Sequence, residues 1–198
     1  MKFEKKFPCH VCDRDFITCE FEGWKAIARI YYDDNTTPPW ERDCGHGPVS
    51  EWTTRAIKAG ERILSQDGPS RRYYDFAEAC KIARADGWGI KEGRKLRERV
   101  NAYAARCAEH DFSVLQAWCK DDWFYVGVAV TIEYKGVSLT GQYDHALWSV
   151  EANYPGSDND YLRDVANDLL PEAISAAKKR GLELALTLSE IKLYGAVS

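Results

Sequence analysis

The alternation of apolar and polar residues predicts two β-hairpins in this chain. The first covers residues 15–34, where the alternation continues on both sides of a turn at Gly23. The second begins with Phe124–Tyr134, turns at Lys135–Gly136 and continues to about Tyr143. Two such hairpins favour an antiparallel sheet.

Helical periodicity predicts three helices around these hairpins. The first follows Asp75, a good N-cap residue, with Glu78 three positions later as in a capping box. The second is long, over residues 91–123, and carries one apolar stripe. The third follows Ser157 or Asp158 and ends near a glycine that comes after a basic turn.

The order of these elements predicts an α+β fold, in which the two hairpins form an antiparallel sheet packed against helices. We expect a single domain over residues 1–198. Residues 1–15, which contain two cysteines, are expected to form an N-terminal appendage. Residues 182–198 stay open, because their alternating leucines fit either an edge strand or an extension of the third helix.

A long irregular connection follows the first hairpin and runs to about Ser70. Its central stretch, Pro38–Trp52, reads PPWERDCGHGPVSEW. Connections in compact domains usually have about 2–6 residues, so a loop of this length needs its own anchors. Trp40 and Trp52 are the expected anchors, because large aromatic side chains gain free energy from burial. We expect a loop that crosses the sheet edge and serves as scaffold or recognition surface.

Composition limits the class of protein without naming a partner. The 198 residues are 45% hydrophobic and 29% charged, which are globular values. No apolar run is long enough to span a bilayer, and no apolar stretch follows the basic start, so we expect neither a membrane partner nor a secretory signal. The seven cysteines lack regular spacing and are expected as reduced thiols, packed or metal-bound.

The cysteines and histidines suggest one metal hypothesis. Cys9 and Cys12 have the two-residue spacing of a metal knuckle, and Cys44 and His46 lie in the long loop. Three thiolates and one imidazole would complete a tetrahedral structural zinc site. The Cys-x-His spacing of the second pair is tighter than usual, so we expect no cofactor and keep structural zinc as an alternative.

A small hydrolase or nuclease is a second alternative, with His46, Asp144 and His145 as its candidate residues. No nucleophile elbow, paired metal motif or phosphate-binding loop accompanies them. We therefore expect no catalytic residues and favour a protein that is not an enzyme.

Charge is unevenly distributed and defines two candidate surfaces. The net charge is −4, but residues 71–106 carry +5 and residues 107–172 carry −9. The acidic candidate face consists of Glu151, Asp158, Asp160, Asp164 and Asp168, of which the last three recur every four residues on one helix face. The basic candidate, for binding nucleic acid, consists of Arg71, Arg72, Arg94, Lys95 and Arg97, with aromatic residues nearby.

Three segments resemble a widespread group of small tailed-phage accessory proteins of unknown function. They are "PPWERDCGHGPVSEWTTR…GERIL", "YYDFAEACKIARADGWG" and "WFYVGVAVTI…SLTGQYDHALWSVE…DYLRDVANDL". The resemblance implies a phage protein in the cytoplasm of an infected bacterium, and it supplies no catalytic residue.

Such phage proteins often disable a host defence system. We therefore expect a non-enzymatic inhibitor of the anti-CRISPR or anti-restriction type, which binds a host protein or nucleoprotein complex. The alternatives are a nucleic-acid-binding accessory protein and the small hydrolase or nuclease. The sequence does not decide whether the protein forms a homodimer.

Overall fold

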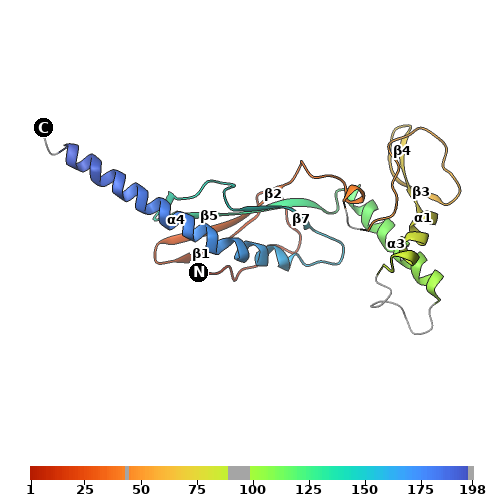
Figure 1. Ribbon diagram of the computed structural model, residues 1–198, viewed down its shortest axis with the longest axis horizontal. Coiled ribbons are helices and arrows are strands. Elements are labelled where there is room, and N and C mark those ends of the chain that lie inside the picture. The colour runs from red at the N-terminus through yellow and green to blue at the C-terminus, as the bar shows by residue number, and fades with distance from the viewer. Residues whose placement is uncertain (43–44, 89–98, 196–198) are drawn as a thin grey trace. The chain divides into compact units, whose positions relative to one another are not determined.

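The computed structural model describes residues 1–42, 45–88 and 99–195 (Figure 1). This part of the chain is an α+β protein with antiparallel sheets and helices, which confirms the predicted fold class. None of its helices combines the length and apolar content that crossing a bilayer requires.

The chain divides into two compact units. Unit 1 consists of Met1–Asp34 and Phe124–Ser198, and unit 2 is Asn35–Trp123, which lies between them in the sequence. The prediction of one domain over residues 1–198 did not separate this inserted stretch. It stays a prediction, because compactness alone does not show whether the two units unfold together.

Unit 1 contains one antiparallel sheet built from both predicted hairpins. Its strands are β1 (Phe16–Phe21), β2 (Trp24–Tyr32), β5 (Phe124–Tyr134), β6 (Val137–Ser138) and β7 (Ala146–Ala152). The order is β1-β2-β5, and both β6 and β7 pair with the free edge of β5. Positive φ angles at Glu22 and Gly23, and at Lys135 and Gly136, give the two hairpins the tight turns that suit the strand twist.

The second arm of the second hairpin is interrupted, so the prediction of a continuous arm to Tyr143 is wrong. Only Val137–Ser138 pair next to the turn, and the chain rejoins β5 as β7. The pairing shifts register between Val126 and Val128. Gly127 lies at this irregularity, and a Cβ there would come within 2.5 Å of the Trp148 ring. Glycine is needed because the indole packs directly on the backbone.

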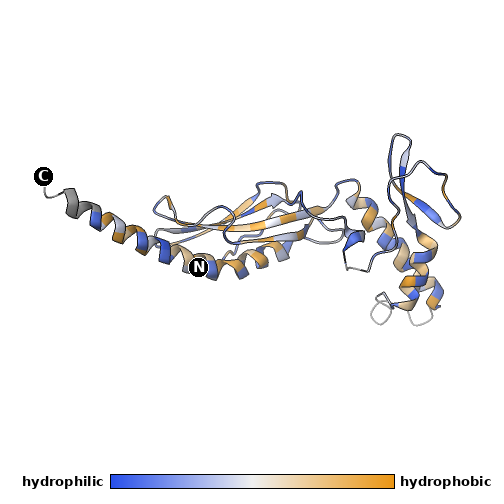
Figure 2. Cartoon of the chain, turned by 45° about the horizontal axis from the view of Figure 1, so that its top comes forward, coloured by the Kyte–Doolittle hydropathy of each residue, from blue (hydrophilic) through white to orange (hydrophobic). Residues whose placement is uncertain are grey.

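Helix α4 (Asp160–Gly195) packs along β5 and forms the other layer of unit 1 (Figure 1). One face of it is fully buried through Leu162, Ala166, Leu170, Ala173 and Ala177. The helix continues through residues 182–195. Of the two alternatives for this stretch, the helix extension is therefore correct and the edge strand is wrong. An edge strand needs a neighbouring strand to pair with, whereas an existing helix is extended one hydrogen bond per residue. Leu182, Leu186 and Leu188 stay about 60% exposed on this extension, and Figure 2 shows hydrophobic and hydrophilic residues alternating along it.

The first residues belong to the core of unit 1 and do not form an appendage. Phe3, Phe7 and Val11 are buried in the same cluster as the sheet and α4. Asparagine side chains hold the backbone of this segment. The Asn167 amide accepts from the Phe3 N–H at 2.8 Å and donates to its carbonyl at 3.1 Å. Asn153 binds both backbone groups of Val11 in the same way, at 2.9 and 3.0 Å.

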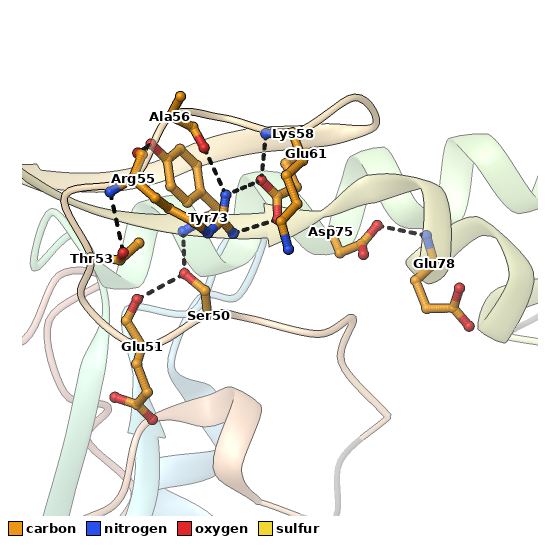
Figure 3. Close-up of polar contacts among 10 residues, drawn as sticks. All are labelled: Ser50, Glu51, Thr53, Arg55, Ala56, Lys58, Glu61, Tyr73, Asp75 and Glu78. Atoms are coloured by element: carbon orange, nitrogen blue, oxygen red, sulfur yellow. Dashed lines mark hydrogen bonds and ion pairs between the residues drawn. The ribbon is translucent and has the colours of Figure 1, made fainter.

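In its described residues, unit 2 combines a strand pair with helices. Its elements are the short 3-10 helix η1 (Pro39–Glu41), β3 (Glu61–Asp67), β4 (Ser70–Asp75), α1 (Phe76–Ala85) and α3 (Val100–Trp118). Strand β3 lies in residues that were expected to be irregular, and β4 begins at Ser70, where that irregular stretch was expected to end. Asp75 caps α1 as predicted, because its Oδ1 accepts from the Glu78 N–H at 2.9 Å (Figure 3).

The long helix predicted over residues 91–123 extends too far at its C-terminal end. Helix α3 ends at Trp118, and a turn follows before β5. Residues 91–98 of the predicted helix lie outside the described residues.

Candidate functional site

The stretch after Gly45 in unit 2 forms an irregular edge beside β4. Val49 and Thr53 make isolated antiparallel bridges with Tyr74 and Arg71. The hydroxyl of Ser50 accepts a hydrogen bond from the Tyr73 N–H at 3.0 Å, as Figure 3 shows. The Gly- and Pro-rich stretch that was predicted to cross a sheet edge therefore runs along one.

A buried carboxylate ties this edge to the helices of unit 2. Asp111 of α3 is only 8% exposed. One of its oxygens lies 2.5 Å from His46 Nδ1, and the other accepts from the Gly47 N–H at 2.8 Å and the Tyr74 hydroxyl at 2.7 Å. Three donors from two other segments thus converge on one side chain, which offsets the cost of burying its charge.

Tyr74 and Gly47 fit closely around this carboxylate. Burial raises the pKa of Tyr74 far above its usual value, and the charge of Asp111 and its hydrogen bond raise it further. Tyr74 therefore stays a neutral donor. A Cβ at Gly47 would lie 2.5 Å from the Tyr74 hydroxyl oxygen and 2.7 Å from the Ala79 Cβ. Only glycine lets the backbone N–H approach Asp111.

Two arginines of unit 2 stack on aromatic rings and are neutralised by carboxylates. Arg55 lies over Tyr73, with 4.5 Å between the guanidinium carbon and the ring centre, and its nitrogens lie 2.6 and 2.7 Å from the Glu61 oxygens (Figure 3). Arg62 lies 3.7 Å from the Phe76 ring centre and 2.7 Å from both Glu109 oxygens. These pairs combine cation–π contact with ion pairing and fix the surface of the strand pair.

The Arg55–Glu61 pair predicts an acid-sensitive step in the stability of unit 2. Hydrogen bonds from Arg55 lower the pKa of Glu61 from its usual 4.5 to about 2. A carboxyl whose folded-state pKa is depressed stabilises the fold above its unfolded pKa and loses that effect as pH falls toward the folded value. We expect Glu61→Gln to lower the melting temperature near neutral pH, with the difference from the parent shrinking between pH 4.5 and about 2. Glu51→Gln, a change at an exposed glutamate of the same unit, is the control. A difference for Glu61→Gln that stays constant down to pH of about 2 would contradict this assignment.

Arg72 also stacks on aromatic rings, but it has no carboxylate partner among the described residues. The guanidinium carbon of Arg72 lies 5.0 Å from the Trp40 ring centre and 5.1 Å from the Trp52 ring centre. Its Nε is buried without a hydrogen-bond partner in the described structure. Trp40 packs edge-on against Trp118 at 5.2 Å, whereas Trp52 is 43% exposed. The two tryptophans that were expected to anchor the loop thus do so partly by holding this arginine.

The acidic face predicted on the third helix lies in unit 1, and the contacts of its members differ. Asp160 forms an ion pair with Lys6, and Asp158 accepts from the Asp160 N–H at 3.0 Å. Asp164 lies 2.9 Å from Arg163 but is 65% exposed. Asp168 is exposed on α4, and Glu151 is exposed on β7. Glu172, which was not included in the predicted face, is also exposed one turn beyond Asp168.

The residues of the zinc hypothesis are divided between the units. Cys9 and Cys12 are exposed in unit 1, and His46 of unit 2 uses Nδ1 to contact Asp111. Cys44 lies outside the described residues. Within the described residues no group of three or more His, Cys, Asp or Glu side chains has the arrangement of a metal site. Because one proposed ligand is not described, structural zinc stays a prediction.

The residues of the hydrolase hypothesis are engaged in separate contacts. His46 pairs with Asp111 in unit 2, whereas Asp144 and His145 belong to unit 1. Asp144 accepts from the Gly141 N–H at 2.7 Å. His145 is 8% exposed, and its Nδ1 has no hydrogen-bond partner in the described structure. The described contacts do not join the three residues.

Of the basic candidates, only Arg71 and Arg72 are described, and Arg94, Lys95 and Arg97 lie outside the described residues. Arg71 Nε donates to the Gln66 side chain at 3.2 Å. Asp111 was missed, although its spacing of three and four residues from Ala108 and Leu115 places it on the buried side of α3. The pairing of Arg72 with two tryptophans had no signal in the local sequence, because Trp40 and Trp52 reach it from distant positions.

Comparisons of the chain with protein-family models, curated proteins and solved structures find no match in any of the three. The resemblance to phage accessory proteins therefore stays an expectation from the sequence.

Proposed function

We propose that this protein is a non-enzymatic, phage-encoded inhibitor that binds a host defence complex of the CRISPR or restriction type. The observation that carries this proposal is the exposed acidic row on α4, formed by Asp164, Asp168 and Glu172. The phage and host-defence context comes from the sequence resemblance.

The row is held on a rigid support. Its members recur every four residues and share one side of the helix, while the buried side of α4 packs on the sheet. Asp168 and Glu172 have no ion-pair partner among the described residues. Machines that handle nucleic acid carry cationic channels, and a fixed row of carboxylates is complementary to such a channel. Complementary charge speeds encounter and sets orientation.

The test is a charge reversal that leaves the Lys6–Asp160 pair intact. We expect the parent protein, expressed in bacteria with an active CRISPR or restriction system, to restore phage plaquing and to co-purify with that system's complex. The triple variant Asp164→Lys, Asp168→Lys, Glu172→Lys is expected to lose the restoration of plaquing. It is also expected to lose co-purification when the purification is done at low salt. A single exposed pair contributes only about 0–1 kcal/mol, so single substitutions are expected to matter little.

A matched control separates position from net charge. Glu4, Glu20 and Glu22 are exposed in the same unit, and their reversal to Lys gives the same charge change. This control is expected to act like the parent, and both variants are expected to melt near the parent temperature. The proposal is wrong if the parent restores plaquing against none of a panel of such systems. Equal activity of the α4 variant and the parent would also refute it.

A further inference from the structure

Arg72 differs from Arg55 and Arg62 of unit 2 in a way that points to a ligand. Arg55 and Arg62 each face a ring and bind a carboxylate at 2.6–2.7 Å. Arg72 lies between two indoles and has no carboxylate among the described residues. The stack holds the guanidinium plane in place, so little conformational freedom remains to be lost when an oxyanion binds.

The positive charge of Arg72 acts on a neighbouring thiol. Burial raises the pKa of Cys119 to about 11, and the nearby positive charge of Arg72 opposes that increase. Nε is enclosed without an acceptor, so any acceptor has to approach the terminal nitrogens of the guanidinium fork.

Trp52 adds a surface that selects among oxyanions. It is 43% exposed although one of its faces is in contact with Arg72. An exposed indole beside a guanidinium suits a ligand that offers an aromatic ring next to an anionic group. The bases and phosphates of single-stranded nucleic acid have this chemistry, because each base stacks on an aromatic side chain and each phosphate accepts from arginine. The side chains of an acidic peptide offer the anion without the ring.

We propose that the Trp40–Arg72–Trp52 cluster of unit 2 binds single-stranded nucleic acid, with a phosphate on Arg72 and a base on the exposed part of Trp52. This activity is separate from the acidic row on α4 and does not depend on it.

The experiment measures binding of the full chain to a fluorescent oligodeoxythymidine of about 15 nucleotides by anisotropy, between about 50 and 200 mM salt. Trp52→Ala is expected to weaken binding about tenfold or more, because stacking on one aromatic side chain is lost. Trp148→Ala is the matched control, since Trp148 is 41% exposed in unit 1, and it is expected to leave binding unchanged.

Arg72→Gln tests the phosphate contact through the salt dependence of Kd, which would not change if Arg72 only supported the fold. Loss of one phosphate contact is expected to reduce the slope of log Kd against log salt by about 0.7. Arg72→Lys keeps the charge, loses the planar fork, and is expected to weaken binding while preserving most of the slope. If Arg72→Gln does not fold, Trp52→Ala still tests the proposal, because Trp52 is partly exposed.

Three results would overturn the proposal. The first is no binding by the parent at the lower salt concentration. The second is equal loss of binding for Trp52→Ala and Trp148→Ala. The third is binding of poly-glutamate at the same affinity as the oligonucleotide with equal dependence on Arg72, which would show a site for carboxylates.

Discussion

Replacing Asp111 with alanine is expected to destabilise unit 2 by about 3–5 kcal/mol, because each buried donor left without an acceptor costs about 1–3 kcal/mol. The substitution would leave three donors without their acceptor, namely His46 Nδ1, the Gly47 N–H and the Tyr74 hydroxyl. Buried donors without partners carry their full desolvation cost. Urea unfolding followed by circular dichroism is the measurement.

Two further variants separate the carboxylate from its neighbourhood. Asp122→Ala removes an exposed carboxylate of the same unit and is expected to change stability by less than about 0.5 kcal/mol. Asp111→Asn keeps the size and one acceptor oxygen, so an intermediate loss is expected. Equal stability of Asp111→Ala and Asp122→Ala would show that the buried network does not hold unit 2 together.

The sequence predicted correctly those elements in which the apolar–polar pattern and the turn or cap residues indicate the same structure. Phe124–Tyr134 alternates along its whole length and ends at Lys135–Gly136, so the strand and its turn were both identified. The helix cap at Asp75 was found because its partner is three residues away. Local chemistry was sufficient at these positions, and the α+β fold follows from them.

The errors share one physical cause, which is that the deciding partner lies far away in the sequence. The β3–β4 hairpin is rich in arginine, and its side chains are covered by aromatic residues from other segments, such as Phe76 and Trp40. The leucines after Gly181 are a separate case, because their alternation left strand and helix undecided, and the chain there continues the helix that precedes it. Contacts across more than a hundred residues, such as Phe3 with Asn167, leave no local pattern to read.

For the candidate sites, too, local spacing was visible in the sequence, whereas contacts between distant residues were not. The acidic spacing on α4 was visible, since four residues make about one helical turn. The same spacing places Glu172 next in the row, although it was left out of the predicted face, but it could not reveal that Asp160 is engaged by Lys6. The Arg72 cluster joins residues 40, 52 and 72, and only the folded chain brings them together.

Removal of residues 1–11 is expected to have the largest effect of all, namely loss of the folded state of unit 1. Phe3 and Val11 are fully buried and Phe7 is 6% exposed. Burial of each such side chain contributes about 1.5–3 kcal/mol, so the segment contributes about 5–9 kcal/mol. That amount is comparable with the whole stability of a typical domain, about 5–15 kcal/mol. Circular dichroism and proton NMR of the shortened chain are the measurements.

Point variants in the full chain show whether the loss comes from these contacts. Phe3→Ala is expected to cost about 3–5 kcal/mol, because it leaves a cavity in the core. Asn167→Ala is expected to cost about 1–3 kcal/mol, because the Phe3 N–H and carbonyl lose their partner. Glu4→Ala, at an exposed neighbouring position, is the control and is expected to melt like the parent. A shortened chain that keeps the parent's β-sheet signal and melting temperature would show that the first residues only rest on a unit that folds without them.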